Sequence, residues 1–592
     1  MSSFDLVIRG GMVADGTGEP LRTADVAVTD GRITEVGRVG GSGRREIDAD
    51  GALVAPGWVD VHTHYDGQAM WDSALAPSSD QGVTTVLFGN CGVGFAPVRP
   101  GAHNVLVELM EGVEDIPGTA LHEGLTWDWE SFPEFLDALE RRPHDVDFAA
   151  QVPHGAVRVY VMGDRGVAGE PATPDDITRM TALVQQGIEA GALGFSTSRT
   201  TNHRSSTGIH TPSLKASSAE LAGIAQGLRR AGRGVMQLVS DFEVLDSEWL
   251  VVLAMAQASG RPVSMTVTEY FTLCEDGGTT GFDVLDRISA ARARGLAMSA
   301  QVAPRAVGVT MGLSTTLNPF MACPPFAEIA DLPLPQKVAA LRDGGVRRRL
   351  LESYAGEVNA TKLAGSVISH FHLMVRLDDP PDYEQGPEDS VTAIAKREGR
   401  TPEEVALDIM LEDNGTGLLY LPLTNYKHWS LDAVRTMLTH PFAVPGLSDG
   451  GAHVGTICDG SFPTFLLSHW GRRRRAGRLP IEFLVERHTR ACAQLVDLND
   501  RGVLAPGYRA DVNVIDLDNL VTRRPQIHQD LPAGGSRLLQ QADGYLHTFV
   551  TGTETYANGK ATGSLPGRLV RGAQQAPAAA AGDRIPANTG RT

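Results

Sequence analysis

Residues 55–64 read Ala55-Pro56-Gly57-Trp58-Val59-Asp60-Val61-His62-Thr63-His64. The apolar residues after the Pro-Gly turn predict a short buried strand. Because side chains alternate along a strand, His62 and His64 point to the same side. Two neighbouring neutral imidazoles at the end of a strand favour zinc or a related divalent ion. The alternative is a pair of polar residues that only cap the strand.

Alternating strand and helix signals follow this stretch and predict an α/β fold. The further strand candidates are residues 84–88, 146–152, 192–196, 234–239, 262–267, 297–302 and 442–447. Helices are expected between several of them, at residues 174–190 with Thr173 as the N-cap, 218–231 and 247–258. Eight such strands would form a TIM barrel, whose active site lies at the carboxyl ends of the strands. His62 and His64 would lie at that end.

Alternating strand patterns also occur at both ends of the chain, and each set is too small to bury a core alone. We therefore predict a small β-sandwich domain built from residues 1–57 and 501–565, beside a barrel spanning residues 58–500. Residues 305–440 hold more chain than one strand-helix repeat needs. They predict an insertion over the barrel mouth, with helices near 335–354 and 401–411. The tail at 566–592 is rich in Ala, Pro, Gln and Gly, which predicts disorder.

The composition argues against several classes of protein. The net charge of −19 disfavours a nucleic-acid partner, because phosphates would be repelled. No stretch reaches the roughly 20 apolar residues that a membrane helix needs. The five scattered cysteines lack CxxC spacing and indicate a reducing compartment. We expect a cytoplasmic protein that acts on a small molecule, with self-association into a homo-oligomer left open.

Two further motifs follow predicted strands. Gly89-Asn90-Cys91-Gly92 follows the second strand, where a Cys91 thiolate could ligate a metal. The alternative is a buried structural cysteine. Ser448-Asp449-Gly450 closes the last strand, where Asp449 could contact the metal and accept a proton from water. The alternative there is a turn residue. The occurrence of all three motifs at strand ends favours one metal site.

These motifs resemble the amidohydrolase superfamily, and within it the N-acyl-D-amino-acid deacylase (D-aminoacylase) group. The resemblance lies in residues 56–66, 82–86, 89–93, 191–197, 448–450 and 500–511, and it covers roughly 4–120, 185–200 and 440–560. It implies a TIM barrel, a two-ended β domain and zinc-dependent hydrolysis of amides. It also implies metal ligation by His62, His64 and Asp449. In the deacylase group, Cys91 would be a further ligand in place of the carbamylated lysine of other amidohydrolases.

The chain departs from this family at strands five and six, each of which usually ends in a histidine. Residues 236–241 and 265–269 contain none. Asp241 or Glu269 could substitute as oxygen ligands, and His370 with His372 forms another candidate pair inside the insertion. The sequence thus leaves one or two zinc or similar divalent ions open, and we expect fewer than two.

The expected activity is metal-dependent cleavage of an amide C–N bond, in an N-acyl (D-)amino acid or a related small amide. A bound divalent ion would activate water, and Asp449 would carry the proton. Four side chains are candidates for substrate binding, unless they are ordinary surface polar residues: Arg199, His203, His453 and Arg376. The alternatives are a hydrolase of cyclic amides or imides in the same superfamily, and a non-catalytic binding protein on a decayed barrel.

Overall fold

A parallel eight-stranded sheet forms the centre of the molecule, in a computed structural model that describes residues 3–269, 278–354 and 368–578. Thr63 pairs with Gly450, directly beyond the first and last strands, so the sheet closes on itself. The predicted TIM barrel is confirmed. Its strands, which neighbour one another in sequence order, are β6 (Trp58–Asp60), β7 (Val83–Phe88), β8 (Asp147–Pro153), β9 (Gly194–Arg199), β10 (Val235–Ser240), β11 (Val263–Thr266), β12 (Met298–Val302) and β16 (Ala443–Pro445).

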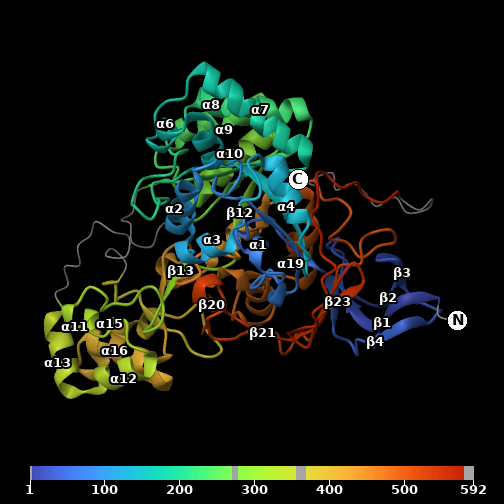
Figure 1. Ribbon diagram of the computed structural model, residues 1–592. Coiled ribbons are helices and arrows are strands. Elements are labelled where there is room, and N and C mark those ends of the chain that lie inside the picture. The colour runs from blue at the N-terminus through green and yellow to red at the C-terminus, as the bar shows by residue number, and fades with distance from the viewer. Residues whose placement is uncertain (1–2, 270–277, 355–367, 579–592) are drawn as a thin grey trace.

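Helices pack around this barrel, and several follow the strand-helix alternation of the sequence. They include α7 (Pro174–Ala190), α8 (Ser218–Ala231), α9 (Leu245–Ser259) and α10 (Gly281–Ala293), which gather on one side in Figure 1. Helix α7 begins as predicted, because the Thr173 side chain accepts a hydrogen bond from the Asp176 amide in a capping box. Among the described residues, no helix is both long and apolar enough to cross a bilayer.

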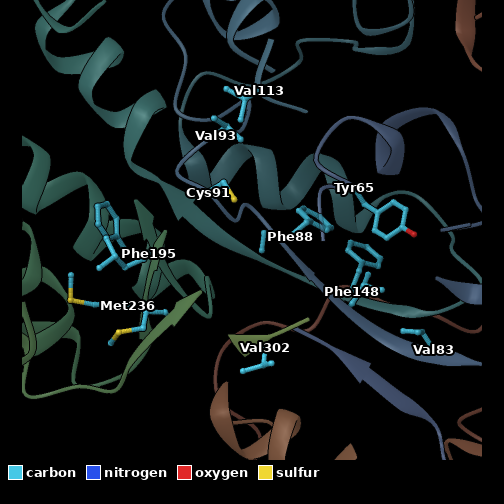
Figure 2. Close-up of a cluster of buried hydrophobic side chains, with 14 of the residues drawn as sticks. Tyr65, Val83, Phe88, Cys91, Val93, Val113, Phe148, Phe195, Met236 and Val302 are labelled. Carbon is cyan, nitrogen blue, oxygen red and sulfur yellow. The ribbon is translucent and has the colours of Figure 1, made fainter. Parts of the chain in front are cut away.

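The barrel core is built from aromatic and sulfur-containing side chains of successive strands. Phe88, Phe148, Phe195 and Met236 belong to β7, β8, β9 and β10 and are fully buried (Figure 2). Cys91, just beyond β7, belongs to the same buried cluster. The core therefore reaches the carboxyl end of the strands, where a site of a TIM barrel is expected.

The two ends of the chain share a nine-stranded mixed sheet, which confirms the two-ended β domain. Strand β5 pairs antiparallel with β17, and apolar residues of both ends, such as Val26 and Phe549, share one core. The strands from the two ends lie side by side in Figure 1. They are β1 (Phe4–Val13), β2 (Arg22–Thr29), β3 (Arg32–Gly37), β4 (Gly43–Asp48) and β5 (Leu53–Pro56), with β17 (Val512–Ile515), β22 (Tyr545–Val550), β23 (Thr553–Ala557) and β24 (Lys560–Ala561).

A buried ionic network joins the barrel to the C-terminal segment. Asp147 of β8 accepts from Arg501 at 2.9 Å and forms an ion pair with Arg509 at 2.7 Å. Arg501 also donates to the Thr85 hydroxyl of β7, and Arg509 pairs with Asp511. All these charged groups are buried, so each depends on its partners for stabilisation.

Whereas α17 (Asp432–Leu438) packs on the barrel, most of the chain between β12 and β16 forms a lobe of its own, visible at the lower left of Figure 1. Its apolar core includes Met311, Leu341 and Leu407. That this lobe covers the barrel mouth stays a prediction. Its elements are β13 (Gly308–Met311), α11 (Pro324–Ala327), α12 (Leu334–Arg342), α13 (Gly344–Ser353), β14 (Val375–Arg376), α15 (Val391–Glu398), α16 (Pro402–Gly415) and β15 (Leu419–Pro422).

The helix expected at residues 335–354 is two helices in the structure. Asp343 has an extended backbone between α12 and α13, and its side chain accepts hydrogen bonds from the amides of Gly345 and Val346. An aspartate that caps the second helix thus ends the first one.

The expectation of disorder from residue 566 onward is wrong for residues 566–578. The Gly567 amide donates to His144, and Leu569 and Val570 are buried against the barrel. The segment bonds along strand β8, because the Val570 amide donates to Phe148. Residues 579–592 lie outside the described residues.

Glu384 attaches the lobe to the helices after β16. It accepts hydrogen bonds from His469 at 2.8 Å and from Arg474 at 2.7 Å. Burial alone would raise the pKa of Glu384, but these two donors hold it at about 2. Because the folded pKa lies below the ordinary value, the stabilisation is present above about pH 4.5 and is lost as the pH falls toward 2.

We therefore expect Glu384→Gln to lower the melting temperature at pH 7. The gap between variant and wild type should shrink as the pH falls below about 4.5, because Glu384 of the unfolded wild type then binds a proton that the folded state excludes. Thermal melts at pH 7, 5 and 3 measure this gap. A gap that stays constant over this range would show that the carboxylate charge contributes nothing to the attachment.

Candidate functional site

The closure of the barrel places Asp449 beside the two histidines. The Asp449 amide donates to the His62 carbonyl at 3.1 Å, and the His64 amide donates to the Gly450 carbonyl at 2.8 Å. Asp449 Oδ1 lies 3.3 Å from His62 Nε2 and 3.6 Å from His64 Nε2. The ends of strands β6 and β16 thus bring together three of the predicted ligands.

Cys91 reaches the same place from the loop after β7. Its Sγ lies 3.3 Å from His62 Nε2. Ligand atoms of His62, His64 and Cys91 all lie within 4.8 Å of one another. In the described part of the chain, this is the one group of three or more His, Cys, Asp or Glu side chains close enough to share a metal ion.

Three residues of this region have left-handed backbone conformations without being glycine. Cys91 has φ +54°, Asp449 has φ +47° and His453 has φ +50°. Such conformations cost on the order of 1–3 kcal/mol each and persist where the surrounding structure enforces them, often at functional sites. The strain coincides with the side chains that converge here.

Two polar side chains that sequence reasoning missed face the outer nitrogens of the histidines. Gln301 Oε1 lies 2.6 Å from His62 Nδ1. Glu114, the last residue of α2 (His103–Glu114), has Oε1 3.3 Å from His64 Nδ1. With Gln301 as the acceptor at its Nδ1, the Nε2 lone pair of His62 is left for the space shared with Cys91 and Asp449.

The buried groups of this cluster fit a divalent cation. Both ring nitrogens of His64 are buried without a hydrogen bond. Burial raises the pKa of the Cys91 thiol, and the Glu114 and Asp449 carboxylates raise it further. Burial would also raise the pKa of Asp449, but His64 and His62 hold it below its usual range. A cation would supply the missing partner of His64 and stabilise the thiolate, and nitrogen, sulfur and carboxylate donors suit zinc.

Comparison with known proteins places this geometry in a family. The profile described as the amidohydrolase family matches residues 45–561. The chain belongs to the amidohydrolase family.

Relatives of this amidohydrolase match over nearly its whole length. An N-acyl-D-glutamate deacylase of Alcaligenes xylosoxydans xylosoxydans is 27% identical, over 96% of each chain. A Mycobacterium bovis protein described as uncharacterized is 27% identical, over 95% of this chain and 93% of its own. A solved N-acyl-D-glutamate deacylase of Bordetella bronchiseptica, complexed with zinc and a phosphonate inhibitor, has a TM-score of 0.63. It covers 96% of this chain and 99% of its own at 24% identity, which shows the shared fold. These matches confirm the resemblance to the deacylase group.

The four predicted substrate contacts of this amidohydrolase lie in different surroundings. His453 Nε2 lies 3.7 Å from Glu114, and Ser198 Oγ bonds His203 Nδ1 at 2.8 Å. Burial, together with the nearby His453 and His64, lowers the pKa of His203 to about 3. Both imidazoles therefore adjoin the ligand cluster, with His203 neutral at physiological pH.

The two predicted arginines are engaged within the protein. Arg199 binds Glu248 through Nε and Nη2, at 2.7 and 2.8 Å, and donates from Nη1 to the Ala216 carbonyl. This speaks against a substrate contact for Arg199. Arg376 lies in the inserted lobe and pairs with Glu412 at 2.7 Å, so its role stays a prediction.

The substitute ligands considered for the missing strand-five and strand-six histidines lie in other contacts. Asp241 accepts from the Thr201 amide, and Glu269 accepts from the Gly281 amide. His370 and His372 face each other in the lobe, with ring centroids 5.5 Å apart. Within the residues that the structure describes, none of these four belongs to a metal-sized cluster.

Proposed function

We propose that this amidohydrolase removes the acyl group from N-acyl-D-amino acids or related small amides, with zinc as its metal. One observation carries the proposal: four potential ligand atoms from His62, His64, Cys91 and Asp449 converge at the carboxyl end of the barrel. The full-length match to an N-acyl-D-glutamate deacylase supports this substrate class.

The chemistry divides between the metal and the protein. A divalent ion held by His62, His64, Cys91 and Asp449 supplies the Lewis acidity that activates water and polarises an amide carbonyl. Asp449 accepts the proton of the attacking water at its carboxylate and then delivers a proton to the leaving nitrogen. His203 and His453, beside the ligand cluster, offer ring N–H groups to the substrate carboxylate.

A substrate panel tests this proposal. Hydrolysis of N-acyl-D-amino acids should exceed that of the matching N-acyl-L-amino acids and of cyclic imides, measured as released amine or ring-opened product. Preferential opening of cyclic amides or imides would overturn the deacylase assignment in favour of the alternative superfamily reaction. A metal-loaded protein inert toward all three groups would favour a non-catalytic binding protein.

The metal content follows from the same geometry. We expect one tightly held zinc or similar ion per chain, or fewer than two, because β10 and β11 contribute no histidine. Elemental analysis of protein purified without chelator measures the ratio. Two full equivalents held by protein ligands would contradict the stoichiometry. A protein that retains no metal in any preparation would contradict the site itself.

A further inference from the structure

We propose that Gln301 is a positioning residue that determines which nitrogen of His62 faces the metal site. This role rests on the proposed metal-dependent function. Gln301 lies on β12, 239 positions from His62, and its Oε1 is 2.6 Å from His62 Nδ1. Both side chains are almost completely buried. The distance is that of a short hydrogen bond away from competing solvent.

The Gln301 amide has a second buried partner on its other side. Its Nε2 donates to the Ser264 hydroxyl of β11 at 2.9 Å. Strands β11 and β12 are paired in register, so both side chains are anchored on the rigid barrel wall rather than on loops. With the amide nitrogen engaged by Ser264, the carbonyl oxygen faces His62.

This orientation selects one tautomer of the imidazole. An amide oxygen only accepts, so the ring proton must lie on Nδ1 and the lone pair on Nε2. His62 Nε2 is the atom that lies 3.3 Å from both Cys91 Sγ and Asp449 Oδ1. A reversed amide would donate to Nδ1 and move the ring proton to Nε2, where it would block metal ligation.

A neutral acceptor also suits the charge of this pocket. Asp449 lies 3.3 Å from His62 and Glu114 lies 3.3 Å from His64, so two carboxyl groups already adjoin the histidines. An amide orients His62 without adding another buried negative charge, which would need its own compensation.

Zinc affinity tests the role without depending on turnover. Gln301→Met keeps the length of the side chain but removes the acceptor, so zinc should bind roughly 10- to 100-fold more weakly in a chelator competition. Gln301→Glu keeps an acceptor for His62 Nδ1, and bound zinc compensates its added charge, so it should restore most of the affinity. With cobalt, the absorption spectrum should change for Gln301→Met and stay close to wild type for Gln301→Glu.

Gln81→Met is the matched control for the loss of a buried glutamine. Gln81 is fully buried and bonds the Gln540 carbonyl and the Thr464 hydroxyl, not a metal ligand. It should lower the melting temperature and leave zinc affinity unchanged.

Three outcomes would overturn the role of Gln301. Wild-type zinc affinity in Gln301→Met would show that His62 needs no such partner. Equal loss in Gln301→Glu and Gln301→Met would show that the acceptor is not what matters. Equal loss in Gln81→Met would reduce the effect to stability. A wild-type protein without zinc affinity would instead overturn the proposed function, and the role of Gln301 with it.

Discussion

Asp449→Asn is expected to lower kcat by roughly 10²-fold or more while the protein stays folded. Asparagine is nearly isosteric with aspartate, so the contacts that close the barrel through the Asp449 backbone should persist. The amide cannot accept the proton of the attacking water, and the chemical step therefore slows. Activity is measured with zinc in excess and with metal occupancy determined on the same sample, because an amide oxygen is also a poorer ligand.

His62→Ala provides the comparison for Asp449→Asn. It removes a ligand nitrogen next to both Cys91 and Asp449, so metal and activity should be lost together. If Asp449→Asn instead retained full occupancy and a near wild-type kcat, Asp449 would be a turn residue only. His453 would then be the first group to examine as the proton carrier.

Asp147→Asn is expected to destabilise the protein by about 3–5 kcal/mol, the usual cost of removing one partner from a buried ionic network. Asp147 is fully buried and faces both Arg501 and Arg509. Its loss leaves two buried guanidinium groups with less compensating charge, at the junction of the barrel and the C-terminal segment. The shift of the urea denaturation midpoint, with the slope of the transition, measures the change.

The control for Asp147→Asn is Asp518→Asn, which removes an exposed ion pair with Arg472. The Asp518 side chain is 77% exposed, so its substitution should change stability by less than about 1 kcal/mol. Equal midpoints for the two variants would show that burial adds nothing to the network around Asp147.

The barrel could be predicted from sequence because its strands can be recognised from their own residues, without knowledge of the tertiary structure. Every residue of β7 and of β8 is buried in the structure. In the sequence, both segments are short and consist mainly of apolar or β-branched residues without helical periodicity. The shared β domain could be inferred because neither end has enough strands to bury a core. The packing of Leu569 and Val570 against the barrel could not be predicted. Two apolar residues in a stretch of biased composition show neither a strand nor a helix periodicity.

Some residues of the candidate site could likewise be predicted from the sequence, and others could not. His62, His64, Cys91 and Asp449 follow strands directly, and the topology of a barrel brings strand ends together. Glu114 ends a helix, and only the tertiary structure brings it next to His64. Its carbonyl also accepts a hydrogen bond from the His453 amide. Arg199 is the last residue of β9 rather than part of the loop after it, and Glu248 of α9 forms an ion pair with it. Such partners depend on tertiary packing that no local motif encodes.

The junction of the two chain ends has a consequence for synthesis on the ribosome. Trp58 of the first barrel strand bonds the Tyr545 hydroxyl, 487 positions later. At roughly 5–20 residues per second, translating that stretch takes on the order of 25–100 s. During this time strand β5 lacks its partner β17, and its apolar edge is open to other chains. The nascent polypeptide is therefore expected to depend on a chaperone until release, and truncated products should aggregate.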